Sequence, residues 1–131
     1  MGIGESKEKN LRKVWKIIMK IIKDKIEITE LDEMSKKMFR NLVKAVVDIE
    51  KEIMAVDAEL HVDLEQFLIE NDSEPKNLWG INIHQQKNGD EYIEFDSMIN
   101  LKPAFNNRTR GIESSEIREK IIKIVNSLVK K

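Results

Sequence analysis

The chain has 131 residues, a formal net charge of −1 and no cysteine. Its length is sufficient for one domain with a single core, and the lack of cysteine excludes disulfides, thiolate catalysis and cysteine-ligated metal clusters. Of the residues, 40% are apolar and 36% are charged, which is typical of a soluble globular domain. The first apolar stretch, Val14 to Ile22, contains lysines and is too short for a signal peptide or a membrane span. We therefore expect a cytoplasmic protein with no membrane partner.

Charge is distributed unevenly along the chain. The first 25 residues are basic, residues 26–75 are strongly acidic, and the remainder is moderately basic. Either these parts neutralise one another in the fold, or an acidic surface lies beside a basic one and attracts a charged partner. The overall balance is not basic enough to indicate binding to duplex DNA.

Helical periodicity predicts four helices. The first covers residues 7–23 and forms an amphipathic extension, residues 1–24, ahead of a single domain at 25–131. The second follows Thr29 as N-cap and runs to about Arg40, and the third covers residues 63–70 with Asp63 as N-cap. The last begins at Ser114 or Ser115. Its apolar stripe consists of Ile117, Ile121, Ile124, Val125 and Leu128.

Two alternating patterns predict two β-hairpins. In the first, a tight turn at Lys51-Glu52 pairs Ile49 with Met54 and Val47 with Val56. In the second, two strands flank Lys87-Asn88-Gly89. A two-residue turn there would set apolar against polar side chains, because a shift of one residue reverses the face of a strand.

A three-residue loop with Gly89 in the left-handed conformation restores the apolar pairing in the second hairpin. Ile83 then lies opposite Ile93, and on the other face Asn82 lies opposite Glu94. Both hairpins present one apolar face that needs a cover. The sequence therefore predicts an α+β two-layer sandwich: an antiparallel sheet of four to five strands built from two hairpins, with helices packed on one face and the other face polar.

Four segments carry a family resemblance: AVVDIEKEIMAVDAELHVDLE, NLWGINIHQ, EYIEFDSMINLKP and NNRTRGIESSEIREKIIKIVNSLV. Together they resemble an uncharacterised family of short prokaryotic proteins, domain of unknown function 5674, from about Ile26 to Val129. The resemblance implies no activity, cofactor or catalytic residue. The lysine-rich segment before Lys25 lies outside this pattern.

Asp57, Glu59 and His61 are the candidate metal ligands. On a strand, residues spaced by two share one face, and carboxylates with an imidazole suit a divalent metal. The same residues also suit a solvated strand face. The chain has no zinc-protease, EF-hand or P-loop motif, so no cofactor is expected.

Candidate ligand-binding residues lie further along the chain. Asn82 and Glu94 share the polar face of the second hairpin, and Asn107, Arg108 and Arg110 precede the last helix. The arginine fork matches carboxylates and phosphates, and a helix N-terminus adds N–H donors. This loop is therefore the candidate anion site, unless its arginines pair with the protein's own acidic residues.

Three functional hypotheses follow. The first is a binding module for a small anionic ligand or an unidentified protein, which also self-associates as a homo-oligomer. The second is a metal-dependent enzyme that acts on phosphodiesters or nucleotides through the acidic residues and the arginines. The third is an RNA-associated protein that uses the basic first helix and the arginine loop.

Overall fold

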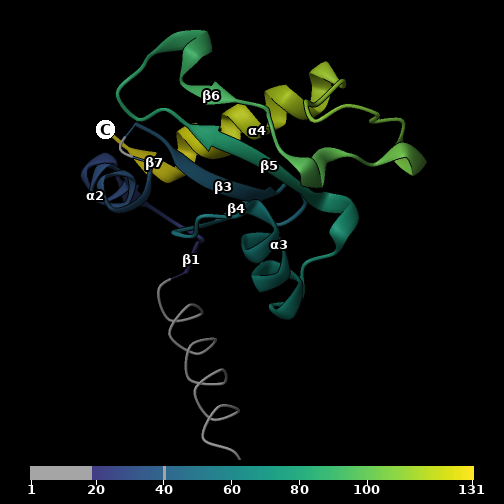
Figure 1. Ribbon diagram of the computed structural model, residues 1–131, viewed down its shortest axis with the longest axis horizontal. Coiled ribbons are helices and arrows are strands. Elements are labelled where there is room, and N and C mark those ends of the chain that lie inside the picture. The colour runs from purple at the N-terminus through teal and green to yellow at the C-terminus, as the bar shows by residue number, and fades with distance from the viewer. Residues whose placement is uncertain (1–18, 40) are drawn as a thin grey trace, which may run out of the picture.

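The computed structural model describes residues 19–39 and 41–131. Its centre is a five-stranded antiparallel sheet in the order β1-β4-β3-β5-β6, which confirms the α+β class and the predicted number of strands (Figure 1). The strands are β1 (Lys20–Ile22), β3 (Val43–Asp48), β4 (Ile53–Val56), β5 (Leu78–Ile83) and β6 (Ile93–Glu94). The α-helices are α2 (Ile28–Met38), α3 (His61–Glu70) and α4 (Ser115–Leu128).

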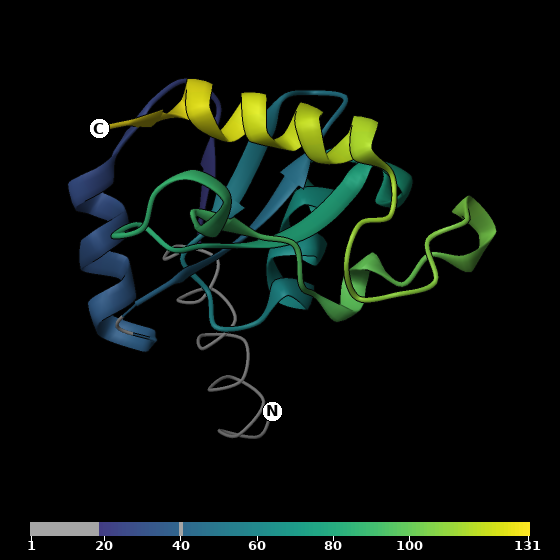
Figure 2. The ribbon, with the colours of Figure 1, turned by 90° about the horizontal axis from the view of Figure 1, so that it is seen from above.

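Short elements complete the described chain. A parallel two-stranded sheet joins β2 (Ile26–Glu27) to β7 (Val129–Lys130). Four 3₁₀ turns lie between the longer elements: η1 (Pro75–Asn77), η2 (Gly89–Glu91), η3 (Met98–Asn100) and η4 (Pro103–Phe105). In Figure 2, α4 crosses the sheet and the η3–η4 segment projects to one side. Within the described ranges, no helix combines the length and apolar character needed to cross a bilayer.

The sheet is covered on both faces because both faces carry apolar side chains. Ala45 and Val47 of β3 belong to the core shared with α2 and α4, whereas Val46 points to the opposite face. There it meets Leu64 and Leu68 of α3. The second face is therefore not the open polar surface that the sequence analysis expected. In the sequence, this packing is indicated by the apolar residues Val46, Ala55 and Leu78. Their strand neighbours belong to the first core, so these three side chains point to the other face.

The first hairpin has the predicted faces but a shifted register. Val47 pairs with Met54 and Ala45 with Val56, a displacement of two residues from the prediction. The turn is longer because Asp48 organises it: its Oδ1 accepts bonds from the N–H groups of Glu50 (2.9 Å) and Lys51 (3.0 Å). Side-chain hydrogen bonds to nearby backbone favour such turns. A shift of two preserves the side-chain faces, so the apolar pattern alone could not distinguish the two registers.

The second hairpin has the predicted register. Ile83 pairs with Ile93 and Asn82 with Glu94, and Gly89 has a φ of +61°. The prediction of a three-residue loop is wrong, however. The last ladder bond joins His84 to Tyr92, and the loop beyond it is longer than three residues. Gln85 leaves the strand direction and donates to Ser35 Oγ in α2 at 2.6 Å, so a contact with a distant helix widens the loop.

The N-terminal boundary also differs from the prediction. The helix expected at residues 7–23 falls largely outside the described residues, but its last turn is a strand instead. Lys20–Ile22 form β1 and pair with β4, and Ile22 joins the first core. The sheet therefore includes residues that the sequence analysis assigned to the extension at 1–24.

Among α2, α3 and α4, only α4 begins where the sequence predicts. Ser114 caps α4, where its Oγ accepts a bond from the N–H of Ile117 at 3.2 Å. The helix α2 begins one residue before Thr29, with Glu27 as its N-cap. The helix α3 begins at His61 rather than after Asp63, and neither of these two caps makes a side-chain hydrogen bond.

Candidate functional site

Polar side chains on β5 and β6 form a connected network. The Nδ2 of Asn82 donates to Glu94 Oε1 at 2.9 Å and to the backbone carbonyl of Asp96 at 3.3 Å. The same Glu94 oxygen lies 3.3 Å from Nε2 of His84. Asn82 and Glu94 are direct partners across the ladder, so the register brings these two candidate residues together. The Oδ1 of Asn82 is buried without a hydrogen bond of normal geometry.

The loop before α4 contributes one arginine to this network. Arg110 Nε donates to Asp96 Oδ1 at 2.8 Å, and both side chains are about half exposed. Such an exposed pair stabilises a fold by about 1 kcal/mol or less. The carboxylate of Asp96 neutralises Arg110, which is the alternative that the sequence left open. Arg108 is exposed, and no hydrogen bond or ion pair is recorded for it.

Asn107 holds the loop rather than facing a ligand. It is 3% exposed, and its Nδ2 donates to the carbonyls of Asn100 (2.7 Å) and Gly111 (2.8 Å). Its Oδ1 accepts from the N–H of Glu113 at 2.8 Å. These bonds occupy both ends of the amide, so Asn107 determines where Arg108 and Arg110 emerge.

The three candidate metal ligands do not share a strand face. The strand β4 ends at Val56, Asp57 has a φ of +77°, and His61 is the first residue of α3. Glu59 is exposed, whereas Asp57 and His61 are buried. No group of three or more histidine, cysteine, aspartate or glutamate side chains within residues 19–39 and 41–131 is arranged to hold a metal ion. The geometric premise of the metal prediction is therefore wrong.

His61 has a structural partner instead. Its Nε2 lies 2.8 Å from the carbonyl oxygen of Ile81, so this nitrogen carries the proton and donates. Burial lowers the pKa of His61, although the bond to the Ile81 carbonyl partly opposes that effect. Burial also raises the pKa of Asp57, whose Oδ1 has no hydrogen-bond partner. In both groups burial therefore disfavours the charged form.

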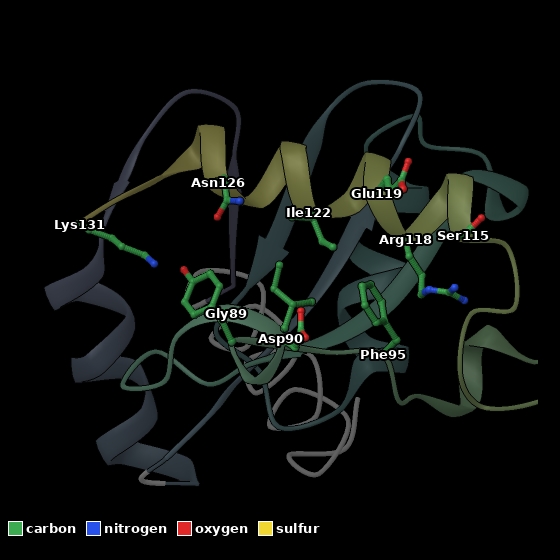
Figure 3. A pocket seen from close by; sticks show the side chains of 11 residues that line it. Gly89, Asp90, Phe95, Ser115, Arg118, Glu119, Ile122, Asn126 and Lys131 are labelled. Carbon is green, nitrogen blue, oxygen red and sulfur yellow. The ribbon is translucent and has the colours of Figure 1, made fainter.

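A cleft lies on the other face of the sheet, between α4 and the η2–β6 segment (Figure 3). Its volume is about 660 Å³, within the range of small-molecule sites. Ile122 points from α4 towards the segment that carries Asp90, and Lys131 reaches towards the same space (Figure 3). The cleft is lined by Gly89, Asp90, Tyr92, Ile93, Phe95, Ser115, Arg118, Glu119, Ile122, Asn126 and Lys131.

Tyr92 is the most unusual residue of this cleft. Its side chain is 4% exposed, and its hydroxyl is buried without a hydrogen-bond partner. Burial raises the pKa of Tyr92, so the hydroxyl is neutral and can donate. The ammonium group of Lys131 lies 4.1 Å from the centre of the Tyr92 ring, a favourable cation–π distance.

Comparison with known protein families identifies the family of this chain. The family described as Protein of unknown function (DUF5674) matches residues 20–128. The chain belongs to this family. The match begins at β1, in agreement with the inclusion of that strand in the sheet. No curated protein and no solved structure matches the chain.

The sequence predicts the Asn82–Glu94 pair of the network but not the cleft. Asn82 and Glu94 follow from the register of one hairpin. The cleft instead combines α4 with β6, and no local pattern specifies how a helix crosses a strand. One signal was present: Ser115, Arg118, Ile122 and Asn126 follow one helical stripe beside the apolar one. Chemically, the cleft offers an apolar surface, cationic and anionic groups, and one unsatisfied hydroxyl.

Proposed function

We propose that this protein is a binding module whose ligand occupies the cleft between α4 and the η2–β6 segment. The observation that carries the proposal is Tyr92, a residue of the cleft wall whose buried hydroxyl has no hydrogen-bond partner among the described residues. A buried polar group without a partner costs about 1–3 kcal/mol of stability. A ligand that accepts a hydrogen bond from Tyr92 would remove that cost on binding.

The chemistry of the walls indicates an elongated ligand with an apolar body. Ile122 is 39% exposed in the middle of α4, and Phe95 is partly exposed on the opposite side of the cleft. Lys131 and Asp90 supply opposite charges. The loop of Arg108 and Arg110 does not enter the proposal, because Arg110 pairs with Asp96 and Asn107 is occupied by backbone groups.

An aromatic anion, 8-anilinonaphthalene-1-sulfonate, provides a direct test because its fluorescence rises in apolar sites. We expect the native protein to enhance the fluorescence of this probe, and Ile122→Glu to abolish most of the enhancement. The side chain of Ile122 is on the surface, so the substitution changes the wall of the cleft and leaves the core intact.

Phe105→Glu is the matched control. Phe105 is 58% exposed in η4 and does not line the cleft. This variant should retain the enhancement that Ile122→Glu loses. An equal response from both variants, with circular dichroism showing both folded, would contradict the proposed site.

A further inference from the structure

The position of β6 at the end of the sheet indicates which kind of ligand the cleft receives. In the sheet order β1-β4-β3-β5-β6, β6 is a terminal strand with a partner on one side. Edge strands present unpaired N–H and C=O groups that can pair with another chain. The residue Ile93 of β6 also lines the cleft, so the strand edge and the cleft belong to one surface.

The direction of the Ile93 backbone follows from the ladder. The N–H of His84 donates to the carbonyl of Tyr92 at 2.8 Å, and Asn82 pairs with Glu94. In an antiparallel ladder, hydrogen-bonded pairs alternate with pairs whose backbone groups point outwards. The N–H and C=O of Ile93 therefore point away from β5. No bond to another part of the described chain is recorded for either group.

The dimensions and chemistry of the cleft fit an extended chain. Its wall on α4 runs from Ser115 to Asn126, about 16 Å at 1.5 Å per residue. That length corresponds to roughly five residues of extended peptide at 3.3 Å each. A peptide backbone presents donors and acceptors together, which matches a cleft lined by both Asp90 and Lys131.

We propose that the cleft binds an extended peptide segment that pairs with Ile93 and continues the sheet beyond β6. This proposal rests on the proposed function and specifies its ligand class. Strand addition supplies main-chain hydrogen bonds, while the wall of α4 contacts alternate side chains. An apolar peptide side chain would lie against Ile122, and a peptide carbonyl or carboxylate would accept a hydrogen bond from Tyr92.

The experiment selects a random heptapeptide phage library on the full chain, with removal of phage that also bind Ile122→Glu. An enriched peptide is then synthesised as a series in which one backbone amide at a time is N-methylated. We expect the affinity to fall at least tenfold when the residue opposite Ile93 is methylated, and to change little for the residues on either side. Deuterium exchange of the Ile93 amide should slow at least tenfold in the complex.

The possible results distinguish failure of the peptide proposal from failure of the proposed binding site. If the library yields no peptide while the naphthalene sulfonate still binds to the cleft, the peptide proposal fails and the proposed function stands. If neither probe distinguishes native protein from Ile122→Glu, both proposals fail. Enriched peptides whose N-methylated series shows no position-specific loss would overturn strand addition.

Discussion

Replacement of Gly80 by alanine tests the packing that holds the segment after β6 against the sheet. A Cβ at Gly80 would lie 2.5 Å from both Cβ and Oγ of Ser97. Ser97 is 1% exposed, and its N–H donates to the Arg110 carbonyl at 2.9 Å, so it cannot move without disturbing the loop before α4. Asn100 is held at the same place: it accepts from the N–H of Gly80 at 2.8 Å and donates to its carbonyl at 2.9 Å.

The expected cost of Gly80→Ala has two parts. Insertion of a methyl group into a packed interior costs about 1–3 kcal/mol. If Ser97 and Asn100 shift, the two bonds between Asn100 and Gly80 are lost, at about 0.5–1.5 kcal/mol each. The middle of these ranges predicts a loss of about 4 kcal/mol in the free energy of unfolding. For a domain of this size, that loss lowers Tm by roughly 15 °C.

Thermal and urea unfolding measure the effect, and another glycine provides the control. A Cβ at Gly111 would meet its nearest atom, the Phe95 carbonyl oxygen, at 3.4 Å, an ordinary contact, so Gly111→Ala should cost less than about 1 kcal/mol. Ser97→Gly removes the two nearest atoms and leaves Cγ1 of Ile99 at 3.1 Å, so Gly80→Ala should cost much less in that background. A small cost for Gly80→Ala alone, or no recovery with Ser97→Gly, would refute this reasoning.

Three further predictions concern charge burial and backbone conformation. Burial raises the pKa of Asp57, so its ionisation weakens the fold as pH rises through that raised value. Asp57→Asn should therefore increase stability to urea at pH 7, and a gain that persists below the ordinary pKa of about 3.8 would contradict this cause. Burial lowers the pKa of His61, so its contribution is complete above about pH 6.5 and declines as pH falls from there towards the lowered value. His61→Gln should flatten this part of a stability–pH curve, and an unchanged slope would assign it to other groups. Gly89→Ala should lower the free energy of unfolding in urea by about 1 kcal/mol, because φ at this position is +61°. No atom lies within 4 Å of the added methyl group, so the cost would come from the backbone. Asparagine tolerates this φ better, so an equal cost for Gly89→Asn would argue against a backbone origin.

The two hairpins show how far sequence patterns predict this fold. Alternation placed Ile83 opposite Ile93 correctly, because a shift of one residue would expose an entire apolar face. The predicted register of the first hairpin was displaced by two residues. Such a shift keeps every side chain on the same face, so the apolar pattern does not oppose it. The deciding contacts are those of Asp48, which also accepts a bond from Ser73 Oγ at 2.6 Å, 25 residues further along the chain. Local patterns do not contain such a distant partner.

The candidate site was predictable to a similar extent. Residues on paired strands, such as Asn82 and Glu94, could be placed together from sequence. Asp57 and His61 could not, because β4 ends one residue before Asp57 and α3 begins directly at His61. The cleft depends on the angle at which α4 crosses β6, which results from packing of the whole core.

The parallel pairing of β2 with β7 determines when the cleft can form. It joins Ile26 to Val129, about 100 residues apart, and closure of a flexible loop of that length costs about 4 kcal/mol of chain entropy. Two short strands offset little of this cost, and we infer that their pairing follows the docking of α4 on the core. Lys131, the residue that covers the Tyr92 ring, comes directly after β7. We infer that the complete cleft forms late in folding, so a partly folded chain would lack the proposed ligand site.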